Sequence, residues 1–285
     1  MFERVLFPTD GSSGAAVAMD HAIAVADRFD STLVVLSVVD ARSLDLGLGE
    51  GELRDRAEDV VASVVERAVD EGVTAAGEVD VGIPDRRIRE YAAANGVDLV
   101  VMGTYGNTGV RRYLLGSVTE KTVRLSDVPV LTVRSDDADP HVPYDRILVP
   151  TDGSERAAAA AEWASALARA YDATVHVLAA ADTSAVGFDV RSELLLETVE
   201  TSAEEAVADL AATLRDDGVT VETAVERGPP HGAILDAVDE NDIDLVVMGT
   251  RGRSGLDRYL LGSVTEKTVR TCPVPVLTVR TAGSE

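Results

Sequence analysis

The hydrophobic positions along the chain follow two alternating patterns. Nearly continuous apolar runs, such as VLF at 5–7, TLVVLSVV at 32–39 and LVVM at 99–102, are typical of strands buried on both faces. Between them, segments such as 14–29 and 52–70 place apolar residues three or four positions apart, as amphipathic helices do. Strands that alternate with helices in this way predict a parallel sheet with helices on both faces.

In the first half of the chain this pattern defines a complete set of elements. It predicts strands at 3–9, 32–39, 73–82, 98–103 and 128–134, and helices at 14–29, 52–70, 85–95 and 117–125. The stretch 41–51 reads as a loop. Because crossovers between parallel strands are right-handed, we expect a five-stranded, doubly wound α/β domain.

The same set of elements occurs a second time. PTDGS at 8–12 returns at 150–154, DLVVMGT at 98–104 returns at 244–250, and VPVLTVR at 128–134 returns at 274–280. A period near 145 residues indicates a duplicated domain, since solenoid repeats are 20–50 residues long. We therefore expect one domain at 1–134, a polar, proline-containing linker at 135–143, and a second domain at 144–285.

Composition narrows the class of protein. The 285 residues carry a formal net charge of −24, which disfavours binding to nucleic acid and to anionic membranes. No apolar run reaches membrane-spanning length, and the chain starts in a strand-like segment rather than a secretory signal. Cys272 is the single cysteine, which excludes an intrachain disulfide and a cysteine-cluster metal site. We expect a cytoplasmic protein.

Lysine is nearly absent, since Lys121 and Lys267 are the only two in the chain. An acidic, lysine-poor composition favours a protein kept soluble in concentrated salt, with an ordinary acidic protein as the alternative.

Two features fall at predicted carboxyl ends of strands, where doubly wound sheets bind ligands. The first is Asp10, with its counterpart Asp152, in the PTDGS segments. A carboxylate there accepts hydrogen bonds from ribose hydroxyls or adenine nitrogen, or it caps the helix that follows. The sequence leaves both roles open.

The second feature is a glycine-rich loop after the DLVVMG strand. Its spacing, Gly103, Gly106, Gly116 and Ser117, recurs as Gly249, Gly252, Gly262 and Ser263. Glycine lets backbone amides approach an anion, and a helix start presents unpaired N–H groups to it. The alternative is a plain turn in which each serine forms a capping box with Glu120 or Glu266. Each loop has a net charge of +2 in this acidic chain, which favours an anion site.

These residues resemble the universal stress protein family in its tandem form. The motif G-x2-G-x9-G-[ST] is complete in both halves and stands with an aspartate after the first strand. The resemblance implies strand order 3-2-1-4-5 in an adenine nucleotide alpha hydrolase-like fold, and ATP or a related adenine nucleotide as ligand, with or without Mg²⁺. It implies nucleotide contacts from Thr9, Asp10, Val38, Gly103, Gly106, Gly116 and Ser117, and from Thr151, Asp152, Ala180, Gly249, Gly252, Gly262 and Ser263.

The resemblance also implies pairing through the last strand. Segments 128–134 and 274–280 are expected to pair within one chain as a pseudo-dimer, with a homodimer of tandem chains as the alternative. A stress-response regulator that binds ATP and hydrolyses it slowly at most is the leading hypothesis. An ATP-using enzyme, such as an ATPase or adenylyl transferase, and a nucleotide-free interaction module are the alternatives.

Overall fold

The computed structural model describes residues 2–45, 49–105, 115–134, 142–182, 192–250 and 261–280. The chain divides into two compact units, Met1–Val142 and Pro143–Glu285. Most of the expected linker, residues 135–141, lies outside the described residues. No helix in the described part of the chain is both long enough and apolar enough to cross a membrane.

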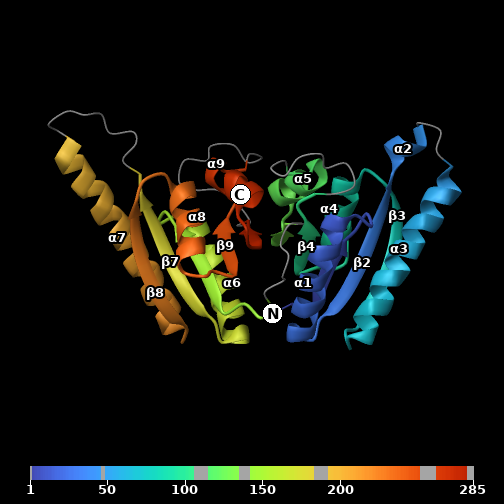
Figure 1. The fold of residues 1–285 in the computed structure, drawn as a ribbon, viewed down its shortest axis with the longest axis horizontal. Helices are drawn as coiled ribbons and strands as arrows, with labels where there is room; N and C mark the ends of the chain where they lie inside the picture. Colours follow the sequence, from blue (N-terminus) through green and yellow to red (C-terminus); the bar gives the residue numbers. More distant parts are fainter. Residues whose placement is uncertain are drawn as a thin grey trace. The chain divides into compact units, whose positions relative to one another are not determined.

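The first unit is a doubly wound parallel sheet (Figure 1). In chain order its elements are β1 (Arg4–Pro8), α1 (Ser13–Phe29), β2 (Thr32–Asp40), α2 (Ala41–Asp45), α3 (Glu50–Asp70), β3 (Ala75–Gly82), α4 (Pro84–Ala94), β4 (Leu99–Gly103), α5 (Ser117–Leu125) and β5 (Val130–Val133). Its strands are parallel and lie in the order β3-β2-β1-β4-β5. The predicted fold class and strand order are confirmed.

The expected loop at 41–51 is wrong for its first residues. Ala41–Asp45 form the short helix α2. The carboxylate of Asp40 accepts a hydrogen bond from the Arg42 N–H at 3.0 Å, which satisfies one of the backbone donors that a helix start leaves unpaired. The following residues are rich in glycine, and this obscured the start of a helix in the sequence.

The second unit repeats the architecture. Its elements are β6 (Arg146–Thr151), α6 (Glu155–Tyr171), β7 (Thr174–Ala181), α7 (Ser192–Asp216), β8 (Thr220–Arg227), α8 (Pro230–Glu240), β9 (Leu245–Gly249), α9 (Ser263–Thr271) and β10 (Val276–Val279). Its parallel strands follow the order β8-β7-β6-β9-β10, which matches the first unit strand for strand.

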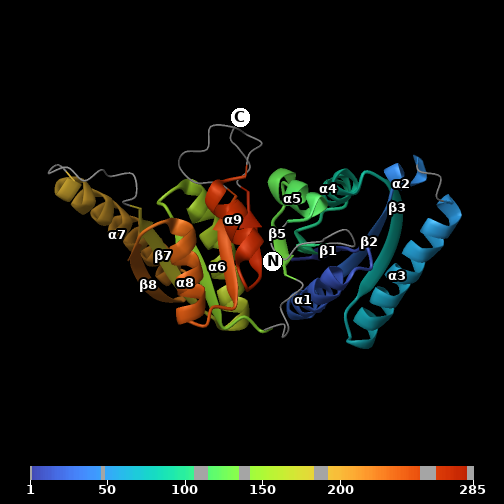
Figure 2. The ribbon, with the colours of Figure 1, turned by 45° about the horizontal axis from the view of Figure 1, so that its top comes forward.

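Helices cover both faces of each sheet. Right-handed crossovers place α1 and α3 on one face of the first unit and α4 and α5 on the other. α3 lies along the outer strands β2 and β3, and α4 packs against α5 (Figure 2). In the second unit α6 packs against α7, and α8 against α9.

The core lies between the central strands and these helices. Val5, Leu6 and Phe7 of β1, and Val100 and Val101 of β4, are at most 1% exposed. Both faces of these strands are buried, so their sequences are continuously apolar rather than alternating.

The two central strands of each unit are aligned at their amino ends by an aspartate. The Asp98 carboxylate, just before β4, accepts hydrogen bonds from the backbone N–H groups of Glu3 and Arg4 at 2.7 and 3.0 Å. Asp244 does the same for Asp145 and Arg146 at 2.9 and 2.8 Å. Each aspartate therefore fixes the first central strand against the second.

At the opposite ends the central strands separate. β1 pairs with β4 only through Val5–Leu99 and Leu6–Val100, although β1 continues to Pro8. β6 and β9 likewise pair through only two residues each. The strand order reverses at these positions, so the unpaired carboxyl ends are where a doubly wound sheet offers its ligand crevice.

Candidate functional site

The loop after β1 presents a carboxylate at the tip of the strand. Thr9 is buried, and its Oγ1 accepts a hydrogen bond from the Gly11 N–H at 3.2 Å. Asp10 is exposed, and its Oδ1 accepts from the Ser12 N–H at 3.0 Å. Gly11 has a φ of +72°, in the left-handed region that favours glycine. This tight turn holds the Asp10 carboxylate in place while leaving it acceptor capacity.

The cap of α1 is Ser12, which settles one of the two roles considered for Asp10. The Ser12 hydroxyl accepts from the Ala15 N–H at 3.3 Å, and Ser12 is the residue that precedes the helix. Asp10 is therefore not the helix cap. Its carboxylate instead accepts a hydrogen bond from the Ser12 N–H, in the turn that precedes the helix.

The second unit reproduces this loop closely. Thr151 Oγ1 accepts from the Gly153 N–H at 3.1 Å, and Asp152 Oδ1 accepts from the Ser154 N–H at 3.1 Å. Ser154 caps α6 through the Ala157 N–H at 3.3 Å. Asp152 is exposed, as Asp10 is. The same backbone device therefore positions an aspartate in both units.

The glycine loop ends at the start of α5, and here the capping box considered as the alternative does not form. Gly116 is the N-cap, α5 begins at Ser117, and no side chain caps the helix. The Gly116 N–H donates to the Thr104 carbonyl at 2.8 Å, and this return to the end of β4 fixes the extended conformation of Gly116. The Ser117 side chain is exposed and is not used as a cap.

The first turn of α5 consequently keeps its backbone donors. Glu120 donates its N–H to the Gly116 carbonyl at 2.8 Å, whereas Ser117, Val118 and Thr119 have no backbone acceptor among the described residues. Next to the end of β4, the described residues thus offer no acceptor for three N–H groups, and the serine beside them is exposed. Such a set favours an anion, because the helix dipole adds to the separate donors.

The start of α9 is the same. Gly262 is the N-cap, without a side-chain cap, and its N–H donates to the Thr250 carbonyl at 2.9 Å. Glu266 donates to the Gly262 carbonyl at 2.8 Å, and Ser263 is exposed. The N–H groups of Ser263, Val264 and Thr265 have no acceptor in the described part of the chain.

A buried threonine joins each helix start to its strand. Thr119 Oγ1 donates to the Gly103 carbonyl at 2.8 Å, and Thr265 Oγ1 donates to the Gly249 carbonyl at 2.9 Å. Sequence reasoning treated these threonines only as part of the supposed capping box. Their repetition at the same place in both halves was the available signal.

Gly103 and Gly249 are required by a close approach of backbone. A Cβ atom on Gly103 would lie 2.5 Å from the Gly14 carbonyl oxygen in α1. On Gly249 it would lie 3.1 Å from the Arg156 carbonyl oxygen in α6. These two glycines thus serve helix–strand packing, whatever else they contact.

The second strand of each unit carries one predicted contact near its carboxyl end. This residue is Val38 in β2 and Ala180 in β7. The Thr9 N–H donates to the Leu36 carbonyl at 2.9 Å, which places Val38 two residues further along β2 from this contact. Ala180 is the equivalent position in β7, next to the partnered residues Thr151 and Ala179. Val38 and Ala180 are both partly exposed, unlike most of their strands.

Two predicted contacts lie outside the described residues, Gly106 and Gly252, with the rest of their loops at 106–114 and 251–260. Every other predicted site residue belongs to a segment that ends or begins at the carboxyl edge of its sheet. Within the described residues there is no group of three or more His, Cys, Asp or Glu side chains that could hold a metal ion.

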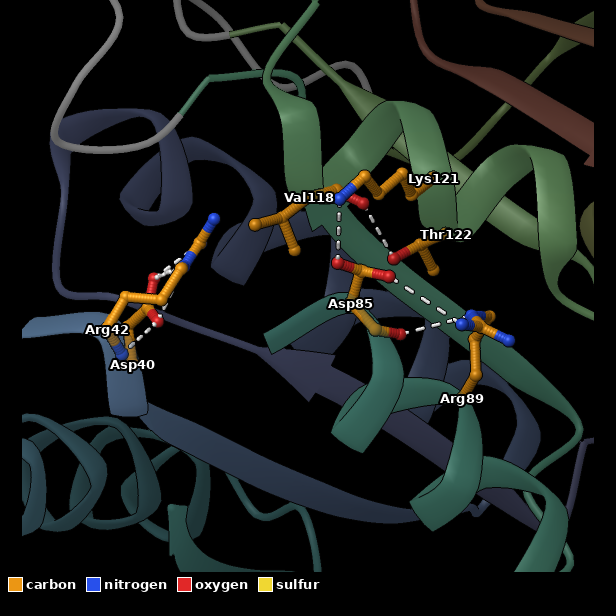
Figure 3. A network of polar contacts seen from close by, with 7 residues as sticks. All are labelled: Asp40, Arg42, Asp85, Arg89, Val118, Lys121 and Thr122. Atoms are coloured by element: carbon orange, nitrogen blue, oxygen red, sulfur yellow. Dashed lines mark hydrogen bonds and ion pairs between the residues drawn. The ribbon is translucent and has the colours of Figure 1, made fainter. Parts of the chain in front are cut away.

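A polar network that sequence reasoning missed lies beside the site in the first unit (Figure 3). Asp40 and Arg42 form an ion pair, and hydrogen bonding from Arg42 lowers the pKa of the Asp40 carboxyl. Asp85, 7% exposed at the start of α4, forms a second cluster with Lys121 and Arg89. Of these contacts, the one between Asp85 and Lys121 joins residues 36 positions apart in the sequence, and no local motif marks it.

The same position of the second unit carries a histidine. His231 Nε2 lies 3.2 Å from Thr271 Oγ1, and His231 Nδ1 lies 3.5 Å from Thr268 Oγ1, both on α9. Burial, and then the positive charge of Lys267, lower the pKa of His231. The two units therefore share a backbone plan and differ in the charge placed next to it.

Known proteins share this organisation. The sequence profile described as "Universal stress protein family" matches residues 1–134 and again residues 143–280. The chain belongs to the universal stress protein family. A universal stress protein of Methanocaldococcus jannaschii is 34% identical over 145 residues, which make up 50% of this chain and 85% of that protein. The crystal structure of a universal stress protein from Archaeoglobus fulgidus covers 98% of both chains, with a TM-score of 0.75 and 24% identity, and so shares the fold.

Another universal stress protein was solved in complex with cAMP; it is 26% identical and covers 49% of this chain, with a TM-score of 0.39. In the tandem universal stress protein described here, both copies of the glycine motif follow the fourth strand of a unit and lead into the last helix.

Proposed function

We propose that this universal stress protein binds ATP or a related adenine nucleotide in both units and acts as a stress-response regulator in the cytoplasm. We assign its domains to 1–134 and 144–285, joined by 135–143. The observation that carries the proposal is the uncapped start of α5 and α9. There, backbone N–H groups with no acceptor among the described residues, and an exposed serine, lie at the carboxyl edge of the sheet.

The residues at this edge fit an adenine nucleotide. Ser117 and the first-turn N–H groups of α5 suit phosphate oxygens. The exposed Asp10 carboxylate suits a ribose hydroxyl or an adenine amino group, and Val38 supplies an apolar surface for the base. Thr9 supports this arrangement by holding the turn. Thr151, Asp152, Ala180 and Ser263 supply the same chemistry in the second unit.

Slow hydrolysis at most is part of the proposal. Phosphoryl transfer needs a positioned water or base and a clamp for the phosphates. Among the described residues the titratable groups closest along the chain to the helix starts are Glu120 and Glu266, which are exposed and lie in the first turn of their helices. A bound Mg²⁺ would neutralise phosphate charge, with the phosphates themselves as its main ligands.

The first experiment is to release the nucleotide carried through purification in high-salt buffer and to count it per chain. We expect about two adenine nucleotides per chain, one for each helix start. About one would indicate that the units are unequal. If no adenine nucleotide is carried and added ATP with Mg²⁺ fails to bind, the nucleotide-free interaction module replaces this proposal.

Two variants of the second unit separate the parts of the site. Asp152→Ala should weaken ATP binding and leave binding of inorganic triphosphate nearly unchanged, because that carboxylate is assigned to the nucleoside. Gly262→Val should weaken both ligands, because a branched side chain enters the space next to the helix start. Equal losses of ATP and triphosphate in Asp152→Ala would remove the nucleoside role of Asp152.

We also propose that the segments 128–134 and 274–280 pair within one chain. Each segment contains the last strand of its unit, and this strand is apolar. An apolar strand left unpaired at the edge of a sheet invites pairing with other chains. One cysteine placed in β5 and one in β10, with Cys272 replaced by serine, should cross-link within a chain and leave the mass on a denaturing gel that of a single chain. A cross-linked dimer would favour a homodimer of tandem chains instead.

A further inference from the structure

The two lysines of the chain occupy equivalent positions in the two units. Lys121 in α5 and Lys267 in α9 each follow the sequence S-V-T-E, one turn after the helix start. All other basic residues apart from histidine are arginine. Each unit therefore carries one primary amine on a side chain, next to its proposed nucleotide site.

In the first unit the lysine is held by a buried carboxylate. Lys121 Nζ lies 3.4 Å from Asp85 Oδ1, and Arg89 Nη2 lies 3.6 Å from Asp85 Oδ2 (Figure 3). Arg89 also donates to the backbone carbonyl of Asp85 at 3.1 Å. Asp85 is 7% exposed, so the carboxylate of this pair is shielded from water, whereas the Lys121 side chain is 41% exposed.

In the second unit both partners are replaced. His231 stands at the position of Asp85, and Leu235 stands at the position of Arg89. The His231 ring is directed to Thr268 and Thr271, in the second and third turns of α9. Lys267 is exposed and makes no ion pair with any described residue. In the described part of the chain, no acidic side chain therefore neutralises its charge.

A lysine at this position can reach the helix start. Long side chains on a helix run back toward its amino end and lie over the residues three and four positions earlier. Figure 3 shows the Lys121 side chain running back toward Val118 in this way. For Lys267 these residues are Ser263 and Val264, and the distance along the axis is about 6 Å, comparable with the length of the side chain.

We propose that Lys267 is an additional phosphate contact in the second unit, and that Asp85 withholds Lys121 from the same role in the first. The second unit then prefers nucleoside di- and triphosphates to monophosphates, and the first unit discriminates less between them. This inference rests on the proposed function and names the ligand class of one of its two sites.

The two lysines allow each unit to be followed separately in the intact chain. Limiting acetic anhydride should acetylate Lys267 several-fold faster than Lys121, because Lys267 is exposed whereas Lys121 is partly covered and its Nζ lies against Asp85. Mass spectrometry of the two lysine peptides measures both rates at once. ATP should protect Lys267 strongly and AMP weakly, and neither should protect Lys121 to the same extent.

Reciprocal variants test the assignment of Asp85 and His231. His231→Asp supplies a carboxylate partner for Lys267, and it should lower the ATP-to-AMP affinity ratio of the second unit by roughly tenfold. The protection curve of Lys267 measures this ratio. Asp85→Asn should raise the corresponding ratio of the first unit, measured through Lys121.

Lys267→Gln keeps the proposal testable if His231→Asp fails to fold, because residue 267 is on the surface. Calorimetric titration should show weaker ATP binding at one site and unchanged AMP binding. Lys121→Gln is the matched control and should leave the ATP affinity of the second unit as it was.

The outcomes separate the two proposals. If ATP and AMP bind and Lys267→Gln changes neither, or if both lysines are labelled and protected equally, the inference about Lys267 is overturned and nucleotide binding stands. If neither nucleotide binds or protects at either unit, the proposed function fails, and the role of Lys267 fails with it.

Discussion

At the scale of single residues, two glycines show how a close helix–strand contact restricts which side chain a position can carry. Gly103 and Gly249 occupy the same place in the two units, but their neighbours differ. The hypothetical Cβ would meet the Gly14 carbonyl oxygen at 2.5 Å in the first unit and the Arg156 carbonyl oxygen at 3.1 Å in the second. A methyl group fits neither place without movement, and the overlap is larger in the first.

Gly103→Ala should therefore destabilise the first unit by about 1–3 kcal/mol, as overpacked sites do. Gly249→Ala should cost less, because its nearest backbone atom lies further away. The free energy of unfolding in urea measures both variants. Equal losses in the two would show that the α1 contact is not what requires glycine at position 103.

Two half-buried histidines in the second unit predict a dependence of stability on pH. His176 Nδ1 lies 3.5 Å from Glu222 Oε2 on the neighbouring strand, yet burial outweighs this carboxylate and lowers the pKa of His176. The pKa of His231 is lowered by burial and by Lys267. The folded protein therefore favours both rings in the neutral form.

The direction in which stability changes with pH follows from the difference between the folded and unfolded pKa values. A base whose folded pKa lies below its unfolded value of about 6.5 contributes stability that is complete above that value and is lost as the pH falls through the folded pKa. We expect the second unit, followed by the fluorescence of Trp163, to lose stability as the pH falls below about 6.5. A His176→Leu, His231→Gln variant should lose less; an unchanged pH profile would assign the effect to carboxylates.

At the scale of elements, the aspartates before β4 and β9 align the two central strands of each unit. Asp98 accepts two N–H groups from the chain leading into β1, and Asp98→Ala would leave both without this acceptor. We expect a loss of about 1 kcal/mol in the free energy of unfolding, limited because water reaches this end of the sheet. Asp98→Asn retains an acceptor oxygen and should lose less.

The fold could be predicted from the sequence because its signals are local and repeated. Apolar runs marked the strands, helical spacing marked the helices, and the duplication allowed each half to check the other. The strand order came from the family resemblance, and the structure confirms it.

The errors have a common physical cause. Ser117 resembles a helix cap locally, but the bond from Gly116 to Thr104 shifts the cap by one residue. The contact between Asp85 and Lys121 joins residues 36 positions apart, and that between Asp98 and Glu3 joins residues 95 apart. Neither could be predicted without knowing which elements pack together.

At the scale of the whole molecule, charge is the dominant property. The formal net charge of −24 opposes compaction wherever it is poorly screened. Raising KCl from about 0.1 M to about 1 M shortens the screening length from about 10 Å to about 3 Å. The melting temperature should therefore rise clearly over this range. A melting temperature that is independent of KCl would favour the ordinary acidic protein over the salt-adapted one.

The close passage of α1 over the end of β4 also bears on how a tandem gene can change. Gly14 is buried where α1 meets Gly103, whereas the matching Arg156 of α6 is partly exposed. Recombination between the two halves would exchange these helices. An α6 segment moved into the first unit would put an arginine side chain at a position where Gly14 is buried, while α1 moved into the second would only remove a side chain there. The duplicated halves are thus no longer interchangeable, and the exchange is better tolerated in one direction than in the other.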